Sequence, residues 1–395
     1  MDLVGELYQR QYGRLVASLV RRFGAHRLDW AEELAQDALL RALETWPYHG
    51  VPPNPEAWLL TTAKNAAIDR LRRERLPVEA FVLEEKPETD DRLAMTFLCC
   101  HPSLPEEMQV ALTLQVVCGL SARQIARGFV LPEATVAQRL VRAKGQLRES
   151  GARFHSEGRL ETVLAVLYLL FNEGYAVTED RAVWFQADFC HEAIYLAKLL
   201  TATKQPAVHA LLALFLLQAS RLPVRIDTAS GEAVPLPDQD RSRWDRRLIA
   251  EGFAHLEASA SGPTVTSYHV EAEIAAIHAA APSFGETDWP RIAELFEQLP
   301  PSPAVSLNRA VAIGYRDRPS AGLAALAGLD SNSHLLFAAR AEFLNQTGDL
   351  AGAAAQFEIA AARARTEPER LYLLRRAGLK RTCLKSENQK PPSAV

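Results

Sequence analysis

Leu120–Arg148, with the sequence LSARQIARGFVLPEATVAQRLVRAKGQLR, is the stretch that indicates the fold of this chain most directly. Ser121 and Gln124 form a Ser-x-x-Gln capping pattern, which is typical of the first turn of a helix. A break at Val130–Pro132 separates this short helix from a second helix that starts at Glu133. A short helix, a tight turn and a longer second helix together predict a helix-turn-helix.

The second helix of this pair combines an apolar seam with a basic surface. Its apolar positions recur at steps of three and four: Val136, Leu140, Ala143 and Leu147. The cations beside this seam are Arg139, Arg142, Lys144 and Arg148. In a helix-turn-helix the N-terminal residues of the second helix reach base edges in the major groove, while cations further along hold phosphates. We therefore predict DNA contacts at Thr135, Gln138, Arg139 and Arg142.

The alternative to DNA binding is a helical hairpin whose basic face is simply solvated. The distribution of charge along the chain helps to choose between the two interpretations. The whole chain has a formal net charge of −4, which is not typical of a nucleic-acid binder. Residues 101–153 nevertheless hold 7 basic and 4 acidic side chains, whereas the chain after 153 holds 24 basic and 28 acidic ones. We therefore expect any DNA contact to come from the first 153 residues.

Length and composition place the chain among ordinary globular proteins. Its 395 residues are enough for two or three domains, and 48% of them are hydrophobic against 23% charged. No uninterrupted apolar run of about 18 residues stands out, and the N-terminal segment lacks a signal-peptide core. We therefore expect a cytoplasmic protein with no membrane contact.

The five cysteines are too few and too scattered to predict a disulfide framework. Cys99, Cys100 and His101 are adjacent, but structural zinc needs four ligands, usually in spaced pairs, and no second pair exists. Several histidines of the C-terminal half show no ligand spacing and are expected to be packing residues: His191, His209, His255, His269 and His278. We predict no metal and no cofactor.

The first 77 residues are predicted to form three helices. The first has an apolar stripe at helical spacing: Tyr8, Tyr12, Leu15, Leu19 and Phe23. Gly24 should end it, and Asp29 with Glu32 is expected to form a capping box for the second helix. The apolar stripe of that helix is Ala35, Ala38, Leu39, Ala42, Leu43 and Trp46. We expect the proline-rich segment Pro47–Pro55 to be a rigid loop in which Asn54 caps the third helix.

The third helix is predicted to have an apolar stripe and a polar face, and to end near Pro77. The stripe is Leu60, Ala63, Ala67 and Leu71. The polar face, at offsets of four, seven and eight, is Asn65, Asp69, Arg72 and Arg73. Such a mixture of donors and acceptors suits the bases and phosphates of nucleic acid. For this helix alone, the favoured interpretation is an exposed end whose cations complement the helix dipole.

Three segments together resemble one known family: AEELAQDALLRALETW (31–46), AWLLTTAKNAAIDRLRR (57–73) and the helical unit at 104–150. In order and spacing they are similar to the extracytoplasmic-function group of sigma factors. Members of that group have two helical domains, numbered two and four, that are joined by a flexible linker. The resemblance implies domain two at 1–77, a linker at 78–103 and domain four at 104–153.

The resemblance also implies partners and roles for residues. Core RNA polymerase is the expected partner of the second helix through Glu32, Glu33, Gln36, Asp37 and Leu40. The −10 promoter element is the expected partner of the loop Pro47–Pro55 and of the third helix through Asn65, Asp69, Arg72 and Arg73. The helix-turn-helix is then expected to read the −35 element.

Nearly every later segment also has a helical pattern, so we predict an all-α fold. Two small helical domains, the second a helix-turn-helix, should precede a helical domain at 154–285 and repeats at 286–385. One stretch resembles a tetratricopeptide repeat by the spacing of Leu344, Gly348, Ala353, Phe357 and Ala360. Simple packing of alanine-rich helices is the alternative. Because such repeats stack into a concave surface, a protein or a small ligand is the candidate partner of this extension.

Two further segments of the extension stand out, Phe171–Tyr175 (FNEGY) and Asp238–Asp245 (DQDRSRWD). The layout resembles a sigma-factor subgroup with a long C-terminal extension, in which both segments recur. Carboxylates, arginines and a tryptophan in one run could bind a small ligand or peptide, or form a salt-bridge network. We favour the network, because arginine–carboxylate forks commonly stabilise structure in this way.

The resemblance implies a sigma factor, and we expect the extension to regulate it. The alternative is a helix-turn-helix transcription regulator with a protein-interaction domain that acts without polymerase, and such a regulator has no need of the loop and polar helix at 47–73. A hydrolase in the C-terminal half is not supported, because the sequence contains no nucleophile elbow, phosphate-binding loop or HExxH pattern.

Overall fold

The computed structural model of the chain describes residues 3–73, 91–129, 131–154, 159–175 and 183–387. Within these ranges the chain forms helices and connecting segments without a β-strand, apart from a single bridge between Ile226 and Ala233. The predicted all-α fold class is therefore confirmed. The chain divides into two compact units. Unit 1 comprises Met1–Glu173 and Tyr195–Leu200, and unit 2 comprises Gly174–Ile194 and Thr201–Val395.

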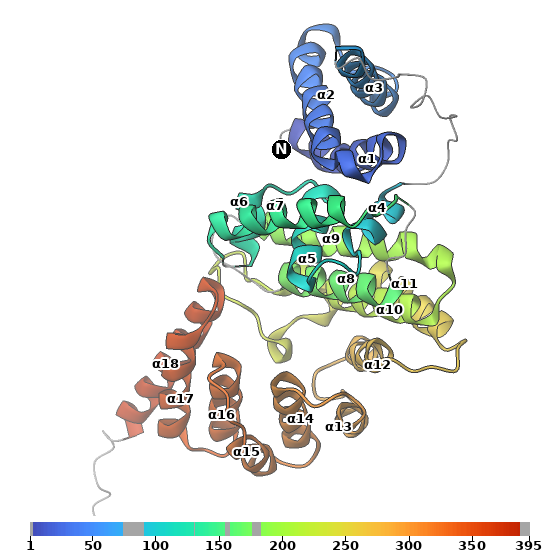
Figure 1. Ribbon diagram of the computed structural model, residues 1–395. Coiled ribbons are helices and arrows are strands. Elements are labelled where there is room, and N and C mark those ends of the chain that lie inside the picture. The colour runs from blue at the N-terminus through green and yellow to red at the C-terminus, as the bar shows by residue number, and fades with distance from the viewer. Residues whose placement is uncertain (1–2, 74–90, 130, 155–158, 176–182, 388–395) are drawn as a thin grey trace, which may run out of the picture. The chain divides into compact units, whose positions relative to one another are not determined.

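Unit 1 begins with three helices that pack on one another (Figure 1): α1 (Leu3–Phe23), α2 (Leu28–His49) and α3 (Pro55–Arg73). Gly24 ends α1 as predicted, at a φ of 90° that disfavours residues with a side chain. Asn54 caps α3 as predicted, since its Oδ1 accepts the Ala57 N–H at 3.0 Å. The predicted stripe of α1 is buried at Tyr12, Leu15, Leu19 and Phe23. The Tyr8 side chain lies outside the described residues.

The predicted capping box at the start of α2 is wrong. Arg27 at the N-cap makes no side-chain cap bond, and Asp29 lies inside the first turn. A 3-10 turn, Ala25–Arg27, leads directly into α2, and the Leu28 N–H donates to the Ala25 carbonyl. The turn therefore supplies an acceptor that a cap would otherwise provide, and the Asp29 carboxylate is available for another partner.

The predicted loop Pro47–Pro55 is also shorter than expected, because α2 continues through Pro47 to His49. Proline removes one N–H donor, but its fixed φ suits a helix, and this last turn is exposed to water. The turn is closed by the Gly50 N–H, which donates to the Trp46 carbonyl at 2.9 Å. Only the remainder of the segment is non-helical.

Two positions of the predicted apolar stripes differ as well. Leu43 of α2 is exposed rather than buried, and in α3 Leu59 rather than Leu60 lies in the core. The core of α3 uses every fourth residue: Leu59, Ala63, Ala67 and Leu71. Leu60 is one position, about 100° of helix rotation, away from that face.

The second part of unit 1 consists of α4 (Arg92–Cys99), α5 (Glu106–Val116), α6 (Ala122–Gly128), α7 (Glu133–Glu149) and α8 (Leu160–Tyr175). Helix α4 lies within the segment predicted as a linker, 78–103, and buries Met95, Leu98 and Cys99. The acidic charge that suggested a flexible linker belongs to residues before this apolar helix; residues 78–90 lie outside the described part. The compact unit also extends past the predicted boundary at 153, because α8 belongs to it.

Unit 2 has α10 (Pro206–Ala219) at its centre, with α11 (Arg246–Ser259) and α12 (Ser267–Ala280) packed on it. Helix α9 (Val183–Leu200) contributes only its first part to this unit. Contrary to the sequence-based expectation, Pro206–Val224 has the length and apolar character of a membrane span. Most of it is nevertheless buried inside the protein, and the core helix of a globular protein has the same character.

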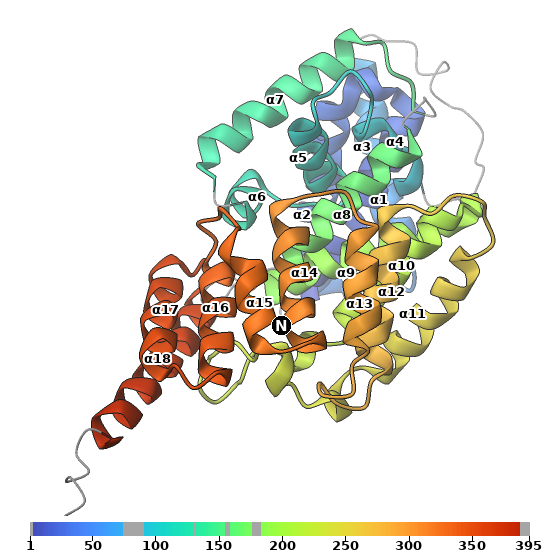
Figure 2. The same cartoon turned by 90° about the horizontal axis from the view of Figure 1, so that it is seen from below.

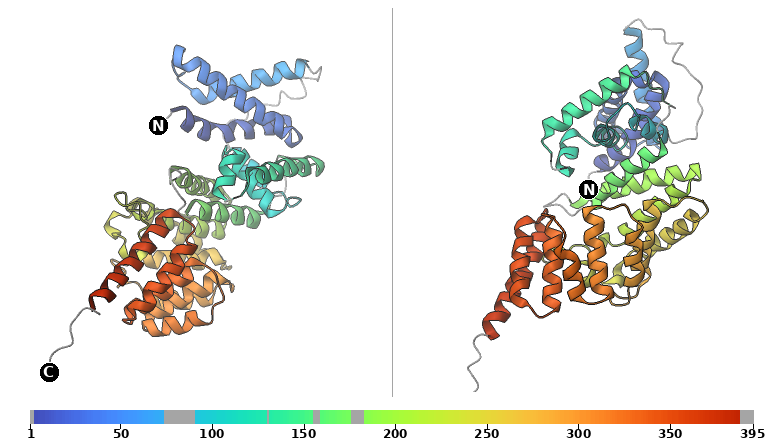
Figure 3. Two further views of the ribbon diagram at one scale, coloured as in Figure 1. Left: turned by 90° about the vertical axis from the view of Figure 1, so that its left-hand side faces the viewer. Right: turned by 60° about the horizontal axis from the view of Figure 1, so that its bottom comes forward.

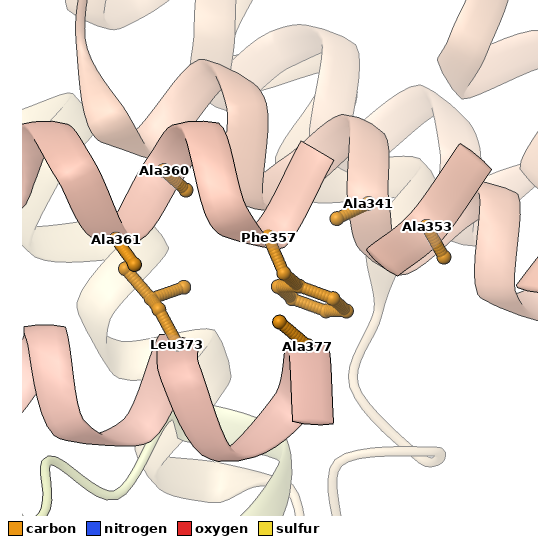
Figure 4. Packing of buried hydrophobic residues seen from close by; sticks show 7 residues of the cluster. All are labelled: Ala341, Ala353, Phe357, Ala360, Ala361, Leu373 and Ala377. Atoms are coloured by element: carbon orange, nitrogen blue, oxygen red, sulfur yellow. The ribbon is translucent and has the colours of Figure 1, made fainter. Parts of the chain in front are cut away.

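The rest of unit 2 is a row of helices in which each packs on the next along the chain (Figures 2 and 3): α13 (Trp289–Glu297), α14 (Pro303–Arg316), α15 (Pro319–Ala327), α16 (His334–Gln346), α17 (Leu350–Arg363) and α18 (Glu367–Glu387). The residues of the predicted repeat lie in α16, α17 and the turn between them. Gly348 has a φ of 89° in that turn, and Ala353, Phe357 and Ala360 are buried against α16 and α18 (Figure 4). The C-terminal part of the extension, 289–387, is therefore a row of helices that stack in chain order.

Phe343 of α16 connects this pair to the preceding one. Its buried ring lies against Gly314 of α14 and Gly322 of α15. A Cβ atom added at Gly314 would lie 2.2 Å from the Phe343 Cζ, and one at Gly322 would lie 2.5 Å from Cε2. Both positions therefore require glycine for this close approach.

The segment Asp238–Asp245 forms a structural network, as predicted, but its chemistry differs from the predicted arginine–carboxylate forks. Arg241 is buried, and its Nη1 donates to the carbonyls of His278 and Ala281 at 2.7 and 2.8 Å. Carbonyls at the end of a helix have no partner within it, so the end of α12 supplies acceptors that replace carboxylates. Asp245 is instead an N-cap, with its Oδ1 accepting two N–H groups of α11.

Candidate nucleic-acid interface

Helices α6 and α7 form the predicted helix-turn-helix. Gln124 Oε1 accepts the Ser121 N–H at 2.7 Å, and the Gln124 N–H donates to Ser121 Oγ at 3.3 Å, which confirms the predicted capping box. The turn is closed by the Leu131 N–H, which donates to the Ala126 carbonyl at 2.8 Å. Helix α7 buries the predicted seam: Val136, Leu140, Ala143 and Leu147. This packing directs the polar residues of α7 away from the core.

The predicted DNA contacts on α7 are not equally accessible. Gln138 and Arg142 are exposed, and Thr135 is half-buried. Arg139 is also half-buried, and its Nη2 lies 2.6 Å from Glu107 Oε2 of α5. The Arg139 guanidinium is thus held by the scaffold of the same domain rather than presented to solvent.

Two further cations of α7 pair with acids at the start of α2. Lys144 Nζ lies 2.5 Å from Glu32 Oε2 and 3.4 Å from Asp29 Oδ1. Arg148 Nη2 lies 2.6 Å from Asp29 Oδ2. The sequence placed these cations beside the DNA-facing surface and these acids on another helix, and only the tertiary structure brings them together.

The predicted polymerase-binding residues of α2 divide into an exposed group and one buried member. The exposed side chains are Glu33, Gln36, Asp37 and Leu40. Glu32 is only 5% exposed, and Tyr12 donates its hydroxyl to the Glu32 carboxylate at 3.2 Å. Burial raises the pKa of Glu32, although Lys144 and the Tyr12 hydroxyl act in the opposite direction.

An exposed apolar strip accompanies the polar face of α2. Leu40 is 55% exposed and Tyr48 is 84% exposed, and Leu43 and Val51 are also accessible. Sequence reasoning identified Leu40 but assigned Leu43 to the core. Leu43 lies four positions after the buried Leu39 and three after the exposed Leu40, so helical spacing alone did not decide between the core and the exposed face.

The predicted polar face of α3 is accessible along its length: Asn65, Asp69, Arg72 and Arg73. Arg73 Nε donates to the Asp69 carbonyl at 3.2 Å, and Arg72 lies 3.9 Å from the Asp69 carboxylate. Arg70, beside this face, pairs with Glu33 of α2 at 2.6 Å. The pair joins α3 to α2, so the polar face of α3 has a defined position relative to the exposed face of α2.

Among the residues that the structure describes, no group of three or more His, Cys, Asp and Glu side chains is arranged to hold a metal. Burial raises the pKa of Cys100 to about 12, which leaves its thiol protonated. His278 packs edge-on to Trp289, and burial, with the charges of Arg221 and Arg241, lowers its pKa to about 3. His269 completes a capping box at the start of α12. His278 is therefore a packing residue, as predicted, whereas His269 has a capping role that was not predicted.

Comparison with known proteins adds three family matches. Residues 9–76 match Sigma-70 region 2, residues 94–147 match Sigma-70 region 4, and residues 159–260 match a family of unknown function, DUF6596. The first match contains α2 and α3, and the second contains α5, α6 and most of α4 and α7. The two candidate DNA-binding faces therefore lie in separate sigma-70 regions.

An uncharacterized protein of Rhizobium meliloti (strain 1021) is 38% identical to this chain over 390 residues, which cover 91% of each protein. The ECF RNA polymerase sigma factor SigE of Mycolicibacterium smegmatis is 30% identical over 160 residues, 38% of this chain and 62% of that protein. Yeast Tom70 superposes with a TM-score of 0.33 at 11% identity, over 98% of this chain and 87% of that one, a likeness too low to carry an argument. Sigma-70 regions 2 and 4, in this order and followed by a helical extension, place this chain in the extracytoplasmic-function group of sigma-70 factors.

Proposed function

We propose that this chain binds core RNA polymerase and directs promoter recognition and transcription initiation. One observation supports this most strongly: two exposed faces with nucleic-acid-binding chemistry, on α3 and α7, lie in different sigma-70 regions of the same chain. A regulator that only binds duplex DNA needs one such face. A second face, on a helix that is not part of a helix-turn-helix, suits a protein that opens DNA at a second element.

The α3 face is proposed to contact the −10 element. Asn65 and Asp69 offer amide and carboxylate groups to base edges, while Arg72 and Arg73 are placed for phosphates. A base that leaves the stack costs a few kcal/mol of unpairing and unstacking, which pocket contacts must offset. The non-helical segment 50–54, which lies directly before α3, is proposed to hold such a base.

The α7 face is proposed to read the −35 element through Thr135, Gln138, Arg139 and Arg142. Gln138 and Arg142 need no rearrangement, since both are exposed near the middle of α7. Arg139 has to exchange Glu107 for DNA. A bidentate contact of arginine with guanine is worth roughly 1–3 kcal/mol of discrimination.

The exposed face of α2 is proposed to bind core polymerase. Glu33, Gln36 and Asp37 supply polar groups, and Leu40 supplies apolar area beside them. Leu43, which sequence reasoning placed in the core, extends this apolar area. An apolar centre with a polar rim is the usual anatomy of a protein–protein interface. Glu32 joins this surface only if it is released from Lys144.

The helical extension is proposed to regulate the sigma regions and to bind a protein or a small ligand on its repeats. The repeat packing of α14 to α17 supports this role, because stacked helix pairs commonly present a partner-binding surface. We also propose that the protein acts in the cytoplasm and has no enzymatic activity of its own, as expected of a polymerase subunit.

Reconstituted transcription tests the proposal. Purified core polymerase and genomic DNA are incubated with or without the full chain, and the 5′ ends of the transcripts are sequenced. We expect new start sites that require both components, and weak, non-specific duplex binding by the chain alone. Tight sequence-specific binding by the free chain, with no polymerase-dependent start sites, would favour the alternative of a polymerase-independent regulator.

A further inference from the structure

Every second helix in the last part of unit 2 contributes to one polar face, which we call the row face. Its residues are Tyr315 of α14, Glu342 and Gln346 of α16, and Tyr372 and Arg376 of α18. Arg376 joins two of these helices: its Nη2 lies 2.5 Å from Glu342 Oε2, and its Nη1 donates to the Tyr372 hydroxyl at 2.7 Å. Tyr315 joins the third, because it shares a side-chain hydrogen bond with Gln346. The row face is therefore continuous from α14 to α18.

Residues 226–240 of the same chain, which we call the strap, reach this face from the end of α10 (Figure 1). The strap begins as a short hairpin with a bridge between Ile226 and Ala233. Two contacts then tie it to α18. The Ala233 N–H donates to the Pro368 carbonyl at 3.0 Å, and Glu232 Oε2 lies 2.6 Å from Arg375 Nε. A main-chain hydrogen bond and an ion pair therefore hold the first half of the strap.

The second half of the strap brings a carboxylate to the two tyrosines of the row face. Burial, with the charges of Glu342 and Asp238, raises the pKa of Tyr315, although Arg376 acts in the opposite direction. Burial and the same two carboxylates also raise the pKa of Tyr372. Asp238 therefore lies near both rings. Beyond it the chain is anchored by Arg241 at the end of α12, so the strap crosses the row face between two attached ends.

The strap is held by contacts that another peptide could replace. Gln239 is the one buried residue of 226–240, and its amide donates within the strap, to the Val234 carbonyl at 2.9 Å. The ion pair with α18 is open to solvent, since 17% of the Glu232 side chain and 48% of the Arg375 side chain are exposed, and solvent screens such a pair. No apolar core of its own fixes the strap in place.

The chemistry of the strap matches that of the surface it covers. Residues 226–240 hold four carboxylates and no lysine or arginine: Asp227, Glu232, Asp238 and Asp240. The row face and its rim offer two adjacent guanidinium groups, Arg375 and Arg376, beside two tyrosines. Arginine and tyrosine commonly dominate the binding energy of protein interfaces, and arginine clusters bind acidic motifs. Pro235 and Pro237 restrict the backbone, which lowers the entropy that binding costs.

We propose that the row face binds an acidic, proline-containing peptide of a partner protein, and that the strap occupies this face in the free chain. The inference rests on the proposed regulatory role of the extension and names the chemistry of its partner. Carboxylates of the partner take the places of Glu232 and Asp238, so the partner and the strap compete for the same arginines and tyrosines.

Hydrogen exchange of the free full-length chain measures how the strap is held. Glu232→Ala removes the pair with Arg375, so the amides of 226–235 should exchange up to about fivefold faster. Glu232→Lys brings two cations together and should also speed exchange, whereas Glu232→Lys/Arg375→Glu restores the pair and should slow it again. Glu257→Ala, which removes an exposed carboxylate of α11, is the matched control and should have no effect. Unchanged exchange in Glu232→Ala overturns the cis contact.

Fluorescence anisotropy with a labelled peptide of residues 230–240 tests the chemistry of the partner. The peptide should bind the Glu232→Ala chain up to about fivefold more tightly than the original chain, because a weakened strap competes less well. The same peptide with Glu232→Lys and Asp238→Lys should bind neither chain. Equal affinity for the two chains, no binding to Glu232→Ala, or equal binding of the lysine peptide overturns the proposal.

Both measurements use the free chain, so their outcome is separate from that of reconstituted transcription. If the peptide fails to bind while the full chain directs polymerase to new start sites, the acidic-peptide site is wrong and the proposed sigma-factor function stands. If the peptide binds as expected and no polymerase-dependent start site appears, the proposed function is wrong and the peptide site stands.

Discussion

Replacement of Gly314 by alanine tests the packing that joins the repeats of the extension. The added Cβ would lie 2.2 Å from the Phe343 Cζ and 2.7 Å from Cε1. The ring has to move by about 1.3–1.8 Å to reach van der Waals distance, yet it is 1% exposed and enclosed by its neighbours. Overpacking of this kind costs about 1–3 kcal/mol, offset by the roughly 1 kcal/mol that alanine gains over glycine in a helix. The expected net loss is up to about 2 kcal/mol of the free energy of unfolding.

The assay is urea unfolding of the full chain, with hydrogen exchange of peptides from α14 to α16 to locate the effect. Gly328→Ala is the control, because no atom lies within 4 Å of its added Cβ, and it should change stability by no more than about 0.5 kcal/mol. Phe343→Leu replaces the ring by a smaller side chain and so makes room for the added methyl group. The double variant Gly314→Ala/Phe343→Leu should therefore lose less free energy of unfolding than the sum of the two single variants, by about 1 kcal/mol or more. Additive effects, or a Gly314→Ala chain that is more stable than the original, would refute the proposed ring–glycine packing.

Three further predictions concern the core, the DNA face and a buried thiol. Phe357→Ala should destabilise unit 2 by about 3–5 kcal/mol in urea unfolding, because it opens a cavity among buried alanines. The control Leu374→Ala, at a half-exposed position, should cost less than about 1 kcal/mol. Equal effects would contradict the assignment of Phe357 to the core. Arg142→Ala should weaken discrimination at one −35 base pair by roughly 1–3 kcal/mol in holoenzyme binding to promoter variants, and a uniform loss across all variants would indicate a phosphate contact instead. Cys100 should resist iodoacetamide at pH 8 in the native chain, because burial raises its pKa to about 12, and it should react after denaturation. Peptide mass spectrometry measures the alkylation. Rapid alkylation of the native chain would contradict the burial of Cys100.

Local signals predicted much of the fold. The capping box of α6, the seam of α7 and the Asn54 cap were confirmed, because each depends on residues three or four positions apart. The start of α2 was missed because a 3-10 turn, which leaves no comparable signature, replaced the expected cap. Helix α4 was missed because the charge of the residues before it dominated the composition of a short window.

Long-range contacts were beyond the reach of sequence patterns. The partner of Lys144 lies more than one hundred positions away in the chain, and nothing near either residue identifies the other. The same holds for Arg241, because its acceptors are main-chain carbonyls, which every residue type has and which the sequence therefore does not mark. The candidate site residues were therefore predictable as surface chemistry. Glu32, Glu33 and Arg139, however, form pairs that only the tertiary structure determines.

The central claim is that one chain presents two separate DNA readers to a promoter when core polymerase holds it. DNA footprinting of the holoenzyme on a promoter identified by transcript sequencing tests this most directly. The account predicts two protected patches about 25 base pairs apart, absent with the free chain. The upstream patch should be lost in Gln138→Ala/Arg142→Ala and the downstream patch in Asn65→Ala/Asp69→Ala. A single patch, or the same footprint without polymerase, would contradict it.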